Sequence, residues 1–210
     1  MRATVRAAMR MAMGAAVSKR RDLELIGSLV PMGGRVLDLG CGAGEMLAYL
    51  REARGCSGYG VEIDDAQVLA CVQRGVNVVQ RNLDEGLATF ADHAFDVVLQ
   101  LDSLQNLRNT EQMLRETVRV GRIGIVSFPN FGYWRNRLSV LGGHMPVTKA
   151  LPYQWYDTPN IRVTTLEDFE RLARQSGLRV LDRFGLQDGQ VVRRWPNLLA
   201  STAVFKIAGA

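Results

Sequence analysis

The sequence predicts an α/β protein built on one mostly parallel, seven-stranded sheet with helices on both faces. From about residue 34 onward, short β-branched runs alternate with amphipathic stretches, as they do in βαβ units. Two runs, Val97-Val98-Leu99 and Ile123-Gly124-Ile125-Val126, are almost entirely apolar, which is typical of strands covered by helices on both sides. A chain of 210 residues with 47% hydrophobic side chains is consistent with a single core.

The pattern assigns the elements in order along the chain. The expected strands are 35–39, 59–63, 77–80, 95–101, 123–128, 179–184 and 202–207, and the expected helices are 45–54, one that begins after Asp64-Asp65, 110–120 and 165–176. The last helix opens with the capping box Thr165-Leu-Glu-Asp168 and is closed by Gly177. Residues 129–163 interrupt the alternation with four prolines and the pair Gly142-Gly143, so we expect an insertion of long loops there.

The distribution of charge argues against a nucleic-acid partner. The net charge is +5, but six basic and no acidic side chains fall within the first 21 residues. The remaining 20 of the 26 basic residues are balanced by 21 acidic ones, so they create no general basic field for phosphates. We expect residues 20–207 to form a single domain and residues 1–19 to be a basic, disordered extension. A transit peptide and a misplaced start codon are the alternatives for that extension.

Several kinds of site and location are also disfavoured. No apolar run approaches the roughly 20 residues that a membrane span needs, and no secretory signal is evident, so we expect a cytoplasmic protein without a membrane partner. The three cysteines, Cys41, Cys56 and Cys71, form no C-x-x-C pair, which argues against a disulfide framework and a zinc site. With only two histidines in the chain, we expect no metal site.

A glycine-rich turn joins the first expected strand to the first expected helix. The stretch Asp38-Leu39-Gly40-Cys41-Gly42-Ala43-Gly44 places glycines where the backbone must turn tightly and let a ligand approach the helix N-terminus. Glu62 ends the second strand 22 positions after Gly40, near the spacing of an acidic side chain that accepts hydrogen bonds from ribose hydroxyls. A nucleotide-like ligand is therefore predicted. The dinucleotide fingerprint has its third small residue where this chain has Glu45, which disfavours NAD.

This loop resembles the V-L-D-L-G-C-G-x-G motif of the S-adenosylmethionine (SAM)-dependent methyltransferases, whose fold is Rossmann-like. The resemblance implies that SAM or its demethylated product S-adenosylhomocysteine (SAH) binds at Gly40, Cys41, Gly42 and Gly44. It also implies that Asp38 faces the ammonium group of the methionine moiety, a partner to which a carboxylate is suited.

The resemblance extends to the adenosine end of the ligand. That family usually has an Asp after the third strand, where it hydrogen-bonds the adenine amino group, and this chain has Asn82-Leu83. An asparagine can still accept through its carbonyl oxygen, so binding of altered strength is implied. Ile63 is implied to pack on the adenine face. Phe95-Asp96-Val97-Val98 matches the family's opening of the fourth strand, where the aspartate is more often structural.

No catalytic set is evident at the end of the fourth strand. The stretch Leu99-Gln-Leu-Asp-Ser-Leu-Gln105 lacks the D-P-P-Y or N-P-P-Y of amino-directed nucleic-acid methyltransferases, and it lacks a Pro-Cys nucleophile. Asp102 and Gln105 are the polar groups expected to face the site, and Asp102 is either a base or a hydrogen-bonded loop residue. In-line methyl transfer can depend mainly on positioning and desolvation, so a missing triad does not decide whether the chain is an enzyme.

The insertion at 129–163 has an unusual composition. Seven of the fifteen aromatic residues of the chain lie between residues 128 and 156. They are consistent with a lid over an acceptor, or with a satellite core. They are also consistent with a protein-binding surface, because aromatic residues and arginines such as Arg135, Arg137 and Arg162 are enriched at interface hot spots.

Longer segments resemble the methionine-biosynthesis MetW family of bacteria over about residues 20–207. They are Arg21-Asp-Leu, Val36-Leu-Asp-Leu-Gly-Cys-Gly-Ala-Gly44, Ser103-Leu-Gln105, Arg119-Val-Gly-Arg122, Ile125-Val-Ser-Phe-Pro-Asn-Phe-Gly132, Met145-Pro-Val-Thr148 and Leu151-Pro-Tyr-Gln-Trp-Tyr-Asp-Thr-Pro-Asn-Ile161. The departures are Asn82, His144 where an Arg commonly precedes Met-Pro, and the basic extension. The resemblance implies a partner, the homoserine O-acyltransferase (acetyl- or succinyl-) that activates homoserine for methionine synthesis.

Three functional hypotheses stay open. The first is an accessory or regulatory subunit of that acyltransferase which binds SAM or SAH and is required for its full activity. Such control requires SAM to bind the activating and non-activating states with different affinity. The second is a SAM-dependent methyltransferase whose small-molecule acceptor enters between Asp102, Gln105 and the insertion. The third is a scaffold whose nucleotide site is vestigial.

Overall fold

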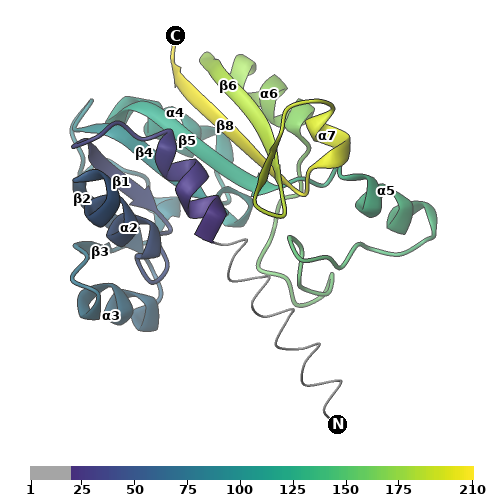
Figure 1. Cartoon of the computed structure of the whole chain (residues 1–210), viewed down its shortest axis with the longest axis horizontal. Helices are drawn as coiled ribbons and strands as arrows, with labels where there is room; N and C mark the ends of the chain where they lie inside the picture. The colour runs from purple at the N-terminus through teal and green to yellow at the C-terminus, as the bar shows by residue number, and fades with distance from the viewer. Residues whose placement is uncertain (1–19) are drawn as a thin grey trace.

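The computed structural model describes residues 20–210 and arranges them around one eight-stranded sheet (Figure 1). The strand order is β3-β2-β1-β4-β5-β8-β6-β7. The strands are β1 (Arg35–Leu39), β2 (Ser57–Glu62), β3 (Val78–Gln80), β4 (Phe95–Leu101), β5 (Gly121–Pro129), β6 (Leu178–Gln187), β7 (Gln190–Val192) and β8 (Thr202–Gly209). The first five run parallel, and β8 lies antiparallel between β5 and β6. The order reverses between β1 and β4, so the carboxyl ends of these strands border the crevice where open α/β sheets bind ligands.

Helices cover both faces of the sheet, as the sequence predicts. The helices are 20–28, α2 (Glu45–Arg54), α3 (Asp65–Gln73), α4 (Thr110–Val120), α5 (Trp134–Leu141), α6 (Leu166–Gln175) and α7 (Pro196–Leu199), with 3₁₀ turns η1 (Leu83–Glu85) and η2 (Leu104–Asn106). One core packs helix 20–28 and α2 on the sheet through residues such as Ile26 and Leu50. The other packs α4 and α6 on the opposite face through Leu114 and Phe169. No helix among residues 20–210 is long and apolar enough to cross a membrane.

Most expected elements are present, and local chemistry sets their ends. The strands at 35–39 and 95–101 and the helices at 45–54 and 110–120 have the expected bounds. Thr165 caps the start of α6 as expected, since its Oγ1 accepts from Asp168 N at 3.2 Å, but the Asp168 carboxylate accepts from this hydroxyl at 2.8 Å and not from the Thr165 backbone N–H of a full capping box. The chain then leaves α6 through Gly177, whose φ of 74° favours glycine.

Three features of the structure correct the sequence-based expectation. The sheet has eight strands rather than seven, because β6 and β7 form a hairpin around Asp188 and Gly189, both at positive φ. Residues 20–28 form a helix that was not predicted, and the insertion contains the helix α5 as well as loops. The expected extension at 1–19 lies outside the described residues.

The insertion projects away from the sheet as an arm, residues 134–161, made of α5 and the loops that follow it (Figure 1). Its base is held by Asn130, a fully buried side chain at the end of β5. The Asn130 amide donates to Asn197 O and Ala200 O at 3.0 and 2.8 Å, and its oxygen accepts from Gly132 N. Asn136 of α5 donates to the Asn130 carbonyl at 3.0 Å. The first turn of the arm is therefore fixed to the domain.

Candidate functional site

The glycine loop turns between β1 and α2 with three glycines in the left-handed region, two of which have no room for a side chain. Gly40, Gly42 and Gly44 have φ values of 76°, 53° and 73°. A Cβ at Gly40 would lie 2.8 Å from Ser103 Cβ, and one at Gly44 would lie 3.0 Å from Cys71 Sγ. A Cβ at Gly42 would meet only Gln67 Oε1, at 3.9 Å. The loop is thus packed tightly behind Gly40 and Gly44 and open in front of Gly42.

Glu62 joins the glycine loop to the end of β2. Its carboxylate accepts from Gly42 N at 2.9 Å, from Ile63 N at 2.8 Å and from Asp64 N at 3.0 Å. Three backbone donors on one carboxylate fix the position of its oxygens. The negative charge therefore stands beside the loop at the carboxyl edge of the sheet.

Asp38 lies at a cavity of about 420 Å³ in front of the glycine loop. Its side chain is 3% exposed, and no hydrogen-bond donor contacts its carboxyl among residues 20–210. Burial, with a smaller contribution from Glu62, raises its pKa to about 7. The cavity is lined by Asp22, Leu23, Ile26, Asp38, Gly40, Cys41, Gly42, Ala43, Glu45, Met46, Gln67, Leu101, Asp102 and Ser127. A buried carboxyl with a raised pKa and no hydrogen-bond donor favours a cationic ligand group opposite it.

A second cavity, of about 380 Å³, shares Asp22 and Asp102 with the first. Asp102 has a positive φ of 50°, is exposed, and lines both cavities. Ser127 Oγ donates to it at 3.4 Å, and desolvation by the surrounding protein raises its pKa. Burial likewise raises the pKa of Asp22, whose Oδ1 has no partner among the described residues. Sequence reasoning missed Asp22, because the helix that carries it was not predicted.

The turn η2 connects the glycine loop to the arm. Ser103 Oγ donates to Leu39 O at 2.8 Å, directly behind Gly40. Two residues later, Gln105 Nε2 donates to Asp102 O at 2.7 Å, and Gln105 O accepts from Ile161 N and Arg162 N at 3.1 and 3.0 Å. The two catalytic candidates therefore lie together, and Gln105 also fixes the last residue of the arm.

The residues expected at the adenosine end lie at the ends of β2 and β3 and do not line the cavity at Asp38. Ile63 is 58% exposed, and Leu83 is buried. Asn82 Oδ1 accepts from Asp84 N at 3.0 Å and so caps η1. Asn82 and Leu83 thus contribute to the local structure, whereas Ile63 presents an open apolar surface.

Cys41 packs the loop and is not a reactive thiol. Its sulfur lies 3.8 Å from Cys71 Sγ, and Cys71 Sγ contacts Gly42 O at 3.1 Å. Burial raises the pKa of both thiols, so they stay protonated at neutral pH.

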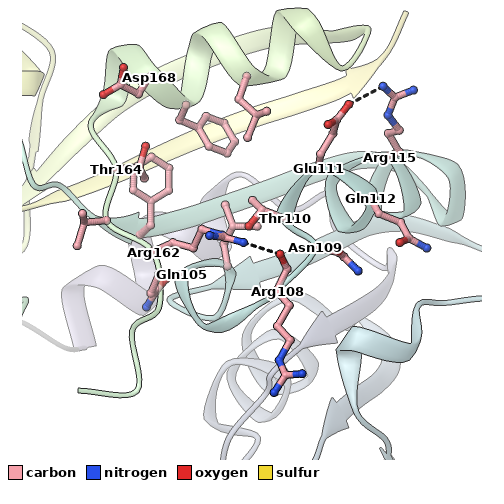
Figure 2. Close-up of a pocket in the computed structure, with 15 residues that line it drawn as sticks. Gln105, Arg108, Asn109, Thr110, Glu111, Gln112, Arg115, Arg162, Thr164 and Asp168 are labelled. Carbon is pink, nitrogen blue, oxygen red and sulfur yellow. Dashed lines mark hydrogen bonds and ion pairs between the residues drawn. The ribbon is translucent and has the colours of Figure 1, made fainter. Parts of the chain in front are cut away.

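A cavity of about 710 Å³ lies on the opposite face of the sheet between the starts of α4 and α6 (Figure 2). Its walls include the buried apolar residues Leu104, Phe128 and Phe169. Polar side chains surround these walls, among them Arg108, Arg115, Arg162 and Asp168. Gln105 lines this cavity as well as the one at Asp102.

Residues 20–207 match the family model described as methionine biosynthesis protein MetW. The chain belongs to this family. The bifunctional methionine biosynthesis protein MetXA/MetW of Rhodopirellula baltica is 37% identical to it over 88% of this chain and 32% of the relative. O-methyltransferase resE of Aspergillus sclerotiorum is 27% identical over 74% of this chain and 59% of the relative. This MetW-family chain is thus shorter than both relatives and spans about a third of the first.

Solved structures share the fold of this MetW-family chain at low sequence identity. A SAM-dependent methyltransferase from Thermotoga maritima, described as a possible histamine N-methyltransferase, has a TM-score of 0.69 and 19% identity, with 98% of this chain and 96% of that chain covered. The [4+2]-cyclase SpnF has a TM-score of 0.64 and 16% identity, with 93% and 82% covered. The predicted methyltransferase-type Rossmann fold is confirmed. Because a protein named as a cyclase shares it, the fold does not fix the reaction.

Proposed function

We propose that this chain binds SAM or SAH at the glycine loop and acts as a regulatory subunit of a homoserine O-acyltransferase in methionine biosynthesis. The observation that carries the cofactor site is the buried Asp38 carboxyl, which faces a cavity without a donor among residues 20–210. The α-ammonium group of SAM or SAH is the kind of partner that such a carboxyl requires. The fused relative, whose name joins MetXA to MetW, supports the acyltransferase as partner.

The residues along the site fit such a ligand from end to end. Asp38 would hold the ammonium group, and the open backbone at Gly42 would lie along the ligand. Glu62 would accept from ribose hydroxyls with lone pairs that its three backbone donors leave free. Ile63 offers an exposed apolar surface to adenine, and Asn82 Oδ1 retains a lone pair for the adenine amino group.

A methyltransferase is the second candidate, favoured by the cavity that shares Asp22 and Asp102 with the first. Bound SAM would supply an electrophilic methyl group. Asp102 would accept the proton that an amine or hydroxyl acceptor loses as it is methylated, because its raised pKa makes it a better base than an aspartate of ordinary pKa. Gln105, with a buried Oε1 that lacks a partner among residues 20–210, would orient such an acceptor.

The test is an assay of the same organism's acyltransferase with and without this protein, in which SAM is titrated into both reactions. We expect stimulation that responds to SAM. A Gly42→Asp variant should lose the SAM response, because its side chain enters the open front of the loop. Gly33→Asp is the matched control, since Gly33 also has positive φ and open space but lies before β1.

The alternatives give different results in the same experiment. No stimulation and no co-elution with the acyltransferase would refute the regulatory subunit. Conversion of SAM to SAH in cell extract would favour the methyltransferase. A vestigial site would give no thermal shift with SAM or SAH, whereas a ligand at 100 times its Kd stabilises a protein by about 2.7 kcal/mol.

A further inference from the structure

The arm is the most apolar exposed segment of the described chain. Of the 21 large apolar side chains that are exposed among residues 20–210, ten lie in the 28 residues of the arm: Trp134, Leu138, Val140, Leu141, Met145, Val147, Tyr153, Trp155, Tyr156 and Ile161. Trp155 and Tyr156 are each 71% exposed and contact each other edge to face, with ring centroids 5.6 Å apart. The satellite-core interpretation of these aromatics is therefore wrong for this pair. Exposed apolar side chains concentrated in one segment favour an interaction site there.

The surface of the arm continues into the 710 Å³ cavity. Val163 lines that cavity and also a narrow groove on the arm, whose other walls include Met145 and Trp155. Figure 2 shows the chain entering from the arm at Arg162 and passing along the cavity toward Thr164 and α6. Since Phe128 and Phe169 form part of the wall, the cavity suits an apolar side chain supplied from outside.

The charges on this surface favour an acidic partner. Arg108, Arg135, Arg137 and Arg162 are four of the ten arginines among residues 20–210 that have no carboxylate within 4.0 Å, and the other ten there form ion pairs. Figure 2 shows that Arg162 instead donates to the Arg108 carbonyl, at 2.7 Å, and that the Arg108 guanidinium extends away from the cavity. The arm itself contains three basic residues and one acidic residue, Asp157.

We propose that the arm and this cavity form one docking surface for the homoserine O-acyltransferase, which inserts an apolar side chain flanked by carboxylates into the cavity. The proposal rests on the proposed function. The fused relative supports this occupant, because fusion keeps its two parts at high local concentration. A second copy of this chain is disfavoured, since a two-fold contact would bring two positively charged arms together.

The affinity of the full chain for the purified acyltransferase tests the surface. Truncating an interface anchor usually weakens binding substantially, so we expect Tyr156→Ala and Trp155→Ala each to raise Kd at least tenfold. Arg108→Glu should raise Kd to a similar extent, mainly by slowing association, and should reduce its dependence on salt. The matched controls are Tyr59→Ala and Arg179→Glu, exposed residues on β2 and β6, which should stay within twofold of the wild type. Retention of the SAH-induced thermal shift shows that each variant is folded.

Each outcome has a distinct meaning. If the wild-type chain does not bind the acyltransferase, the proposed function fails, and this surface fails with it. If the wild type binds and the arm and cavity variants bind equally well, only the docking surface is wrong. A concentration-dependent dimer of the wild type that Tyr156→Ala abolishes, with acyltransferase binding intact, would assign the surface to a second copy and overturn the proposal.

Discussion

Replacing Asp38 by asparagine should make the stability of the ligand-free protein less dependent on pH and should remove SAH binding. Burial raises the pKa of this carboxyl from 3.8 to about 7 in the folded protein. The folded state therefore binds the proton more tightly than the unfolded state does. The contribution of protonated Asp38 to the free energy of unfolding is fully present below about pH 4. This contribution is lost as the pH rises through about 7.

The magnitude follows from the size of the pKa shift. A difference of about three pKa units corresponds to about 4 kcal/mol, which is the cost of the ionised carboxylate at pH 8. Asparagine carries no charge but buries an amide without partners, which costs about 1–3 kcal/mol. The variant should then be more stable than the wild type at pH 8 by about 2 kcal/mol, or roughly 5 °C in Tm for a chain of this size. At pH 4 this advantage should be absent.

Denaturant unfolding of both proteins between pH 4 and pH 8, without ligand, measures the effect directly. Asp157→Asn on the exposed arm is the control for loss of a carboxylate. SAH should stabilise the wild type at pH 8 and leave Asp38→Asn unchanged. A stability difference between the wild type and Asp38→Asn that stays constant across this pH range would refute the reasoning, because it would mean that the folded protein tolerates the Asp38 charge.

Three further predictions concern the same site. The Kd for SAH should rise about tenfold between pH 7.5 and pH 6, because the ligand requires the ionised form of Asp38, and calorimetry that finds a constant Kd would contradict this. Gly44→Ala should destabilise the protein by about 1–3 kcal/mol more than Gly33→Ala, as judged by denaturant unfolding, because both have positive φ but only Gly44 has Cys71 and Val76 within contact distance. Asn82→Asp should lower the Kd for SAH several-fold in the same calorimetry, since a carboxylate accepts more strongly from the adenine amino group and can still cap η1. Equal affinity of Asn82→Asp and the wild type would show that position 82 does not contact adenine.

The sequence predicts best those elements in which the apolar pattern and the glycines at the element ends indicate the same boundaries. The strand at 35–39 contains Val36, Leu37 and Leu39 and is closed by Gly40, and the helix at 45–54 ends at Gly55 in the left-handed region. The helix at 20–28 was missed because its apolar residues, such as Ile26, are few. Their spacing indicates a helix only when their packing against α2 is known. The hairpin of β6 and β7 could have been found, since Asp188-Gly189 is a strong two-residue turn signal.

The candidate site likewise contains residues that the sequence indicates and residues whose positions depend on tertiary packing. The glycine loop and Glu62 were both predicted from the sequence as ligand-binding residues, and they lie together, joined through Gly42 N, because parallel strands place their carboxyl ends at one edge. Asp22 carried no local signal for its position beside Asp102, since that contact depends on how helix 20–28 packs. The cavity between α4 and α6 was likewise not predictable, because its walls come from segments far apart in the sequence.

The turn η2 is where ligand binding and docking can be coupled. Ser103 packs behind Gly40, and Gln105 holds Ile161 and Arg162, so a ligand that moves the glycine loop acts on the base of the arm through one short turn. Coupling between two sites is reciprocal: if SAH changes the Kd for the acyltransferase by some factor, the acyltransferase changes the Kd for SAH by the same factor. A SAH titration with and without the acyltransferase therefore measures the coupling without any assay of catalysis. The proposed regulation requires the two Kd values to differ, because equal values shift no equilibrium, however tightly SAH binds.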